Sequence, residues 1–191
     1  MFSACTGDKQ LYKDASQPVE KRVKNLISQM TLEEKVAQMC QYIGINHIRE
    51  AEASLSVEEM EKSHAQGYYP GMNGDSVVAL TEKGLIGSFL YVLDIEEANY
   101  LQSLAMKSRL QIPLLLGIDA VHGNALYRGA TVYPSAIGQA SMFCPELVEE
   151  SSRQTALEVR AAGSHWTFAP NIEITRDARW GRTGETFGED P

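Results

Sequence analysis

The sequence has few cysteines, and they lie far apart. Cys5, Cys40 and Cys144 form no CxxC or CxxH pair, so we expect no structural zinc site. Cys40 follows apolar residues at helical spacing, and we expect it to pack on an apolar helical face as a small hydrophobic residue.

Long apolar runs and basic clusters are lacking too. No apolar run approaches the length needed to span a bilayer, so we expect no transmembrane segment. The 17 Lys and Arg residues are outnumbered by 25 Asp and Glu, which gives a formal net charge of −8. A basic stripe with interleaved aromatic residues does not occur, and we therefore expect no nucleic-acid partner.

Several familiar catalytic and nucleotide-binding motifs are missing. The chain has no Gly-x-Ser-x-Gly nucleophile elbow, and its glycines do not follow the spacing of Walker or Rossmann phosphate loops. The histidines His47, His64 and His165 have no partner at metal-ligand spacing. We therefore predict no metal ligands.

The first 17 residues are polar and read as a linker or as the remnant of an export signal. Residues 2–5 (FSAC) resemble the end of a bacterial lipoprotein signal, in which small residues precede a lipidated cysteine. The charged start and apolar run of such a signal are missing. A lipid anchor at Cys5, in the periplasm or at the outer membrane of a bacterium, and an ordinary N-terminus both remain open.

Helical patterns dominate the next part of the chain. Apolar residues from Val19 to Met30 recur at three- and four-residue steps and predict a helix from Pro18. Thr31 and Glu34 form a capping box for a second helix. We expect that helix to place on one face Leu32, Val36, Met39, Cys40 and Ile43. Ser56 is expected to cap a short helix, residues 67–75 to form a loop, and another helix to begin near Val77.

Apolar runs and helical segments then alternate. The runs 85–93, 112–118 and 166–174 predict buried strands. Between them we expect a helix capped by Asp94 that runs to about Leu110, and a helix from Pro145 to about Ala162. Strands that are apolar throughout predict a parallel sheet covered by helices, hence an α/β fold. An open doubly wound sheet and a (β/α)8 barrel both fit this pattern.

Two polar segments directly follow predicted strands, where ligands bind in parallel α/β folds. Residues 119–124 follow one strand, and residues 175–191 follow another. A carboxylate such as that of Asp119 can accept hydrogen bonds from two neighbouring hydroxyls, and an arginine supplies several donors in fixed geometry. Trp180 or Phe187 could stack on a ring. This inventory suits a sugar.

Other polar residues of these segments have structural interpretations. His122 is expected to bond neighbouring backbone and hold its loop. Arg176 and Arg179 flank Asp177 and are expected to form internal ion pairs. The pairs of glutamates at 58–59 and 149–150 are expected to lie on solvated helix faces.

Three runs resemble motifs of the family 3 glycoside hydrolases, in that family's order and spacing: 31–39 (TLEEKVAQM), 117–123 (GIDAVHG) and 168–191. The resemblance extends from about Pro18 to Pro191. It implies that residues 18–191 are an incomplete N-terminal domain, a partial (β/α)8 TIM-type barrel. Glu173 and Ala178 stand where many members have aspartate and proline, which leaves the subgroup open.

The resemblance also implies an activity. Members hydrolyse terminal non-reducing β-D-glycosyl residues with retention of configuration and without a cofactor. For this chain we expect the residues to be β-D-glucosyl. In the family, the residues that match Asp119 and Arg182 bind the sugar of an oligosaccharide or β-glycoside. The nucleophile and the acid/base are expected beyond Pro191, so we assign no catalytic residue to this chain, and its partner would be the missing C-terminal remainder.

Alternatives remain at this stage. Asp119 and Glu185 could themselves form the pair of carboxylates that a retaining glycosidase needs. The chain could be a non-catalytic sugar-binding fragment, or belong to a β-xylosidase or β-N-acetylglucosaminidase of the same family. A structural α/β domain without a site is the simplest reading.

Overall fold

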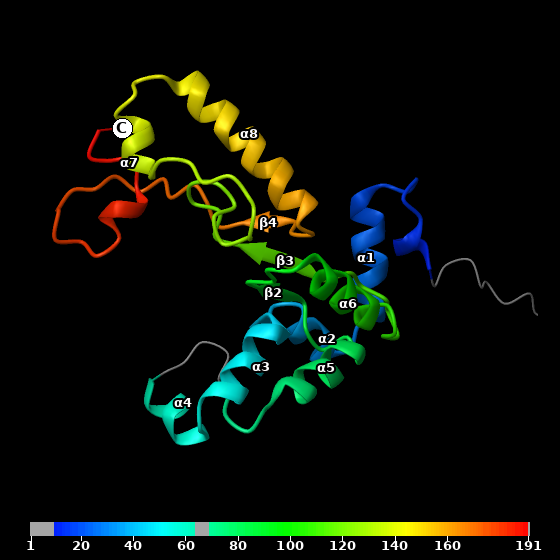
Figure 1. Cartoon of the computed structure of the whole chain (residues 1–191). Coiled ribbons are helices and arrows are strands. Elements are labelled where there is room, and N and C mark those ends of the chain that lie inside the picture. The colour runs from blue at the N-terminus through cyan, green and yellow to red at the C-terminus, as the bar shows by residue number, and fades with distance from the viewer. Residues whose placement is uncertain (1–9, 64–68, 191) are drawn as a thin grey trace, which may run out of the picture.

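The computed structural model describes residues 10–63 and 69–190 of the chain (Figure 1). The predictions for Cys5 and His64, and the start of the loop predicted at 67–75, lie outside these residues. The sheet has four parallel strands, β1 (Gln41–Ile43), β2 (Ser88–Leu90), β3 (Leu115–Ile118) and β4 (Trp166–Thr167).

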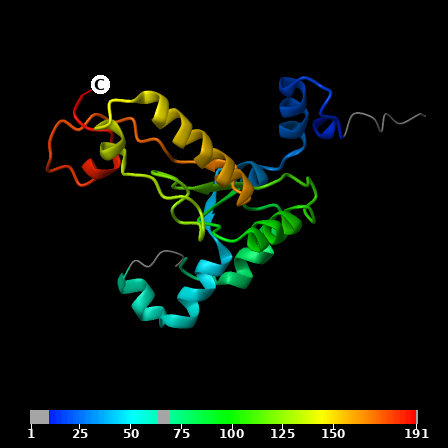
Figure 2. The same ribbon diagram turned by 45° about the horizontal axis from the view of Figure 1, so that its top comes forward.

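Ten helical segments surround the strands in the described part of the chain. They are η1 (Leu11–Lys13), α1 (Val19–Gln29), α2 (Leu32–Ala37), α3 (Ile45–Ser54), α4 (Val57–Ser63), α5 (Gly74–Glu82), α6 (Ile95–Ala105), α7 (Ala136–Ala140), α8 (Pro145–Ala161) and η2 (Thr183–Glu185). Helices α3, α5 and α6 gather near β2, whereas α8 runs alongside β3 and β4, as both views show (Figures 1 and 2).

The order of the strands separates the two folds that the sequence left open. Each strand pairs with the next along the chain, in the order β1-β2-β3-β4, and all pairs are parallel. A doubly wound sheet reverses its strand order at a switch point, whereas a (β/α)8 barrel does not. The described strands contain no reversal. The α/β prediction is confirmed, and the sheet is part of a TIM-type barrel.

Most predicted helix starts are confirmed. Thr31 accepts a hydrogen bond from the Glu34 backbone, and the Glu34 side chain accepts one from the Thr31 backbone. Ser56 and Glu59 make the same reciprocal pair at α4. Asp94 caps α6, and Pro145 is the first residue of α8. These local signals work because a helix start needs acceptors for backbone N–H groups that have no partner within the helix.

The prediction of one long apolar face after Thr31 was wrong. Helix α2 ends at Ala37, the chain turns, and Ile43 lies in β1, a strand that we did not predict. Parallel pairing with β2 overrides the helical spacing there, because it joins Ile43 to Leu90 in register. Met39 is 79% exposed. Cys40 is therefore outside any helix, and it is only half-buried.

Two further boundaries differ. Helix α6 ends at Ala105 rather than near Leu110, because the next N–H groups, those of Lys107 and Ser108, donate to carbonyls only three residues back, as in turns. Strand β4 is only two residues long, and both are exposed. Its register with β3 ends at Thr167, although the Phe168 N–H still donates to the Ile118 carbonyl, and the rings of Trp166 and Phe168 are in contact.

The segment before Pro18 was predicted as a linker or signal remnant, and that boundary stays a prediction. Its described part packs against the chain: the Tyr12 hydroxyl donates to the Leu110 carbonyl at 2.9 Å, and the Tyr12 carbonyl accepts from Arg22 Nε. These contacts hold η1 on α1.

The core lies between β1–β3 and helices α3, α5 and α6. Its fully buried members include Ile45, Phe89, Leu101 and Leu116, each at most 1% exposed. Burial of such side chains is the main favourable contribution to folding. The strands that carry the polar loops are thereby fixed to their helices.

One carboxylate is buried in this core. Glu97 on α6 is 6% exposed, and its Oε1 accepts a hydrogen bond from the Asn46 backbone at 2.9 Å, at the start of α3. Desolvation raises the pKa of Glu97, while hydrogen bonds from the backbone of Asn46 and Ile45 oppose that shift. Glu97 thus belongs to α6 but caps the start of α3.

We predict that ionisation of the buried Glu97 carboxyl lowers the free energy of unfolding as pH rises. A carboxyl whose pKa is raised on folding stabilises the fold below its unfolded pKa, and this contribution is lost as pH rises through the folded pKa. The free energy of unfolding of the wild type should therefore fall relative to Glu97→Gln as pH rises above about 4.3, the ordinary pKa of a glutamate. Urea denaturation of both proteins at several pH values measures this. The exposed neighbour Glu96→Gln is the control, and a flat difference for Glu97→Gln would contradict the prediction.

Candidate functional site

Polar side chains from adjacent strands meet at the carboxyl edge of the sheet. Tyr91 follows β2, and its hydroxyl donates a hydrogen bond of 2.5 Å to Oδ2 of Asp119, which follows β3. This bond to Asp119, together with desolvation, raises the pKa of Tyr91 to about 12. Asp119 is half-buried, so its other carboxylate oxygen can meet a ligand.

The backbone on both sides of Asp119 is tied to β4. The carbonyl of Ile118 accepts a hydrogen bond from the Phe168 backbone at 3.1 Å, and the N–H of Ala120 donates to Thr167 Oγ1 at 3.4 Å. Asp119 therefore leaves the sheet from a fixed position rather than from a free loop.

Arg182, the second predicted sugar-binding residue, is exposed and ion-paired. Its guanidinium donates to both carboxylate oxygens of Glu185, with Nη2 at 2.7 Å from Oε2, and Asn171 donates to the same oxygen at 2.8 Å. The hydrogen bonding of Arg182 to Glu185 raises the pKa of Arg182, and the negative charge of Asp119 raises it further.

Two buried threonines anchor the segment that carries Arg182. Thr175 Oγ1 and Thr186 Oγ1 are 2.7 Å apart and hydrogen-bonded, and Thr186 has no exposed surface. The Thr175 N–H also donates to the Gly188 carbonyl at 3.0 Å. A buried hydroxyl without a partner costs about 1–3 kcal/mol, so this pair strongly favours the closed loop.

The structural interpretation of the flanking residues is confirmed in most places. His122 Nδ1 lies 3.0 Å from the Tyr133 carbonyl, and the Tyr133 N–H donates to the His122 carbonyl. Arg179 pairs with Asp177. Arg176, predicted to do the same, forms no ion pair within the described part of the chain.

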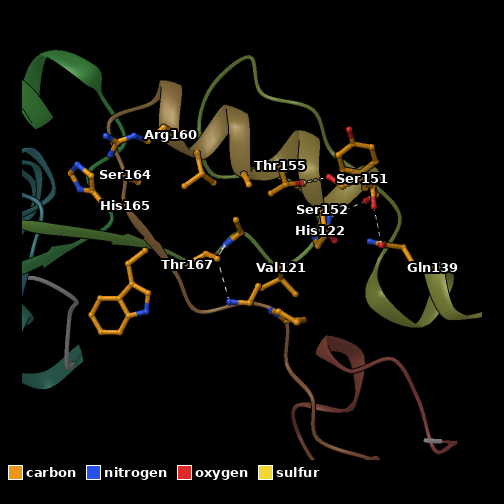
Figure 3. A pocket seen from close by; sticks show the side chains of 18 of the residues that line it. Val121, His122, Gln139, Ser151, Ser152, Thr155, Arg160, Ser164, His165 and Thr167 are labelled. Carbon is orange, nitrogen blue, oxygen red and sulfur yellow. Dashed lines mark hydrogen bonds between the residues drawn. The ribbon is translucent and has the colours of Figure 1, made fainter. Parts of the chain in front are cut away.

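A cavity of about 450 Å³ lies beside this edge, between α8 and the loop after β3 (Figure 3). Ser152 and Thr155 of α8 line one side of it, and Val121, His122 and Thr167 line the other. Neither Asp119 nor Arg182 lines it. We place the candidate site at Asp119 and not in this cavity, because the carboxylate and the guanidinium can bind hydroxyl groups in fixed geometry.

Within the described residues, no cluster of three or more His, Cys, Asp and Glu side chains is arranged to hold a metal ion. Among the same residues, every helix is too short or too polar to cross a membrane.

Residues 31–191 match the glycosyl hydrolase family 3 N terminal domain. This chain belongs to glycosyl hydrolase family 3. It is 32% identical over 88% of its length to a lysosomal beta glucosidase of Dictyostelium discoideum, and 31% identical over 88% to a periplasmic beta-glucosidase of Salmonella typhimurium. Over 52% of its length it is 40% identical to a beta-xylosidase of Formosa agariphila.

A solved structure has the same architecture. The beta-glucosidase of Listeria innocua in complex with glucose superposes with a TM-score of 0.67 at 30% identity, over 90% of this chain. That match covers 22% of the Listeria protein. The chain likewise spans 21%, 18% and 14% of the three curated relatives.

Sequence reasoning missed two residues of this edge. Tyr91 lies in an apolar run that we read only as a strand, and Asn171 lies in another. The available signal was their place at or beyond strand ends, where a polar group in an apolar run faces the ligand edge.

We predict that the loop after β3 depends on a glycine that no other residue can replace. A Cβ on Gly123 would lie 2.2 Å from the Thr131 carbonyl oxygen, and its φ is +94°. Gly129 has a similar φ of +92° but open space around it. Gly129→Ala should cost only backbone strain, about 1–3 kcal/mol. Gly123→Ala should cost about 1–3 kcal/mol more, from the clash. Chemical denaturation compares the two variants, and equal losses would contradict the prediction.

Proposed function

We propose that this chain carries part of the glycone-binding subsite of a retaining β-glucosidase that acts on terminal β-D-glucosyl residues. The observation that supports this most directly is the hydrogen bond of Tyr91 to Asp119 at the carboxyl edge of a partial barrel, where the pKa of Arg182 is raised by its hydrogen bonding to Glu185 and also by the charge of Asp119. Ligands bind at that edge in barrels of this type. The named relatives and the glucose complex of the Listeria protein agree with the proposal.

In this proposal, Asp119 accepts hydrogen bonds from neighbouring sugar hydroxyls, and Arg182 donates to one of them. A carboxylate accepts through two oxygens, and a guanidinium donates through a rigid fork, so together they favour one orientation of the ring. Hydrogen bonds to charged groups are worth about 1.5–3 kcal/mol each. Such bonds speed the reaction only where they strengthen in the transition state.

Glu185 does not fit the role of a catalytic partner for Asp119. A nucleophile needs a free carboxylate, but Glu185 binds Arg182 through both oxygens and Asn171 through one. The hydrogen bond from Arg182 lowers the pKa of Glu185, which disfavours the protonated form that an acid requires. We therefore propose that the two catalytic carboxyl groups lie outside residues 1–191.

A β-xylosidase is the second candidate. The Formosa agariphila relative has the highest identity of the three curated relatives named above, over half of the chain. Glucose and xylose differ by the hydroxymethyl group, so the choice between them depends on the space beside that group rather than on Asp119. A comparison of the two sugars in any binding assay decides between the candidates.

We also propose that the protein is periplasmic, in keeping with the periplasmic relative of Salmonella typhimurium. Osmotic-shock fractionation of the source cells tests this, and recovery in the spheroplast fraction would contradict it. The lipid anchor at Cys5 stays a prediction.

Asp119→Asn and Arg182→Lys should both weaken glucose binding. Loss of one charge-assisted hydrogen bond, at about 1.5–3 kcal/mol, raises the dissociation constant roughly 10- to 150-fold. Ligand-observed NMR titration measures this. Asp177→Asn and Arg179→Lys are matched controls, because that exposed ion pair lies in the same segment. Equal behaviour of the control and site variants would refute the assignment.

The 191-residue chain should not hydrolyse p-nitrophenyl β-glycosides. A retaining glycosidase needs two carboxyl groups about 5–5.5 Å apart, and we propose that neither belongs to this chain. Release of p-nitrophenol from glucoside, xyloside and N-acetylglucosaminide substrates measures turnover. Measurable release of p-nitrophenol by the 191-residue chain would contradict the prediction and place the catalytic carboxyl groups within residues 1–191.

A further inference from the structure

The Asp119 carboxylate, which binds the sugar in the proposed function, is hydrogen-bonded to the neighbouring Tyr91. Asp119 Oδ2 accepts the hydroxyl of Tyr91, whereas Oδ1 accepts no hydrogen bond within the described part of the chain. Oδ1 is also not among the buried unpaired atoms of these residues, so it faces solvent. One oxygen is therefore occupied, and the other is available to a ligand.

The ring of Tyr91 is held firmly between two parts of the core. It packs against the main cluster around Phe89 and Leu116, and also against the smaller cluster of Ile118, Ala120 and Val159. A side chain wedged between two packed groups has little rotamer freedom, so its hydroxyl has a fixed position.

The backbone of Tyr91 is fixed as well. Its φ is +57°, a conformation that costs a residue with a side chain about 1–3 kcal/mol unless the surroundings enforce it. The Tyr91 N–H donates to the Gly117 carbonyl at 3.2 Å. A Cβ on Gly44 would come within 2.7 Å of the Tyr91 carbonyl oxygen, so only glycine leaves room for this turn.

We propose that Tyr91 is a positioning residue that acts through Asp119. Its hydroxyl fixes the rotamer of the Asp119 carboxylate, occupies Oδ2, and directs Oδ1 toward the sugar hydroxyls. The backbone turn after β2 exists to place that hydroxyl. This inference rests on the proposed role of Asp119 in sugar binding and adds a residue that prepares the site before the sugar arrives. Such preorganisation improves affinity because it lowers the ordering cost of binding.

A double-mutant cycle on glucose affinity tests the proposal. Tyr91→Phe keeps the packed ring and removes only the hydroxyl, and we expect a roughly three- to tenfold weaker affinity, an indirect effect that is smaller than the loss of a charged hydrogen bond to the sugar. In the Asp119→Ala background, the same change should have no effect, because its target is gone. A loss of equal size in both backgrounds would overturn the proposal, since Tyr91 would then touch the sugar itself or support the fold generally. Tyr100→Phe, on the exposed surface of α6, is the matched control.

Ionisation of Tyr91 provides a readout that needs no sugar. The chain with ¹³Cζ-labelled tyrosine is titrated by NMR, and the Tyr91 resonance is identified by its loss in Tyr91→Phe. At pH 11 a tyrosine with a pKa of about 12 is only about one-tenth ionised. In Asp119→Asn, we expect the Tyr91 pKa to fall and ionisation at pH 11 to rise severalfold.

The two readouts fail separately. An unchanged Tyr91 titration in Asp119→Asn would overturn the Tyr91–Asp119 contact and the proposal with it. A shifted titration together with no glucose binding by the wild type would leave the contact intact but refute sugar binding, and hence the positioning role. Circular dichroism spectra of each variant show whether an effect comes from loss of the fold.

Discussion

The in-order parallel pairing of β1 to β4 is the constraint on which the rest of the structure depends. It places the carboxyl ends of all four strands at one edge, so that residues far apart in sequence meet there. Tyr91 and Asp119 are 28 positions apart, yet their side chains are hydrogen-bonded because β2 and β3 are neighbours in register. The buried contacts between the strands and α3, α5 and α6 stabilise this register.

A second property of the edge is its balance of charge. Three acidic side chains, Asp119, Glu173 and Glu185, act on the pKa of Arg182, and all of them raise it. Glu185 already holds the guanidinium through both carboxylate oxygens, and Asn171 donates to that carboxylate as well. In the proposed function, a sugar hydroxyl that approaches would therefore find donors and acceptors whose directions are set in advance, which lowers the ordering cost of binding.

The sequence alone predicts much of this molecule where the signal is local. Capping residues such as Thr31, Asp94 and Pro145 mark helix starts correctly, because the unpaired N–H groups there need nearby partners. Strand β1 escaped prediction because its three residues continue a helical spacing, and only pairing with β2 decides otherwise. The pattern of apolar runs could not separate a barrel from a doubly wound sheet, because strand order is a long-range property, but the family resemblance implied the barrel.

The sequence likewise predicts some residues of the candidate site and misses others. Asp119 and Arg182 came from motifs that resemble those of the family, and Asp119 lies at the expected strand end. Their partners could not be predicted, because the roles of Tyr91, Glu185 and Asn171 depend on contacts between elements. Glu185 in particular looked like a possible catalytic carboxylate until its pairing with Arg182 was known.

The most direct test of the account is a ¹H–¹⁵N NMR titration of the chain with D-glucose. The account places the sugar at Asp119 and Arg182 and outside the cavity beneath α8. The amide resonances of residues 119 and 182–185 should therefore shift in a saturable manner, while those of Thr155 and Ala156, which line the cavity, should not. Saturable shifts confined to the α8 residues would contradict the account and move the sugar site into the cavity.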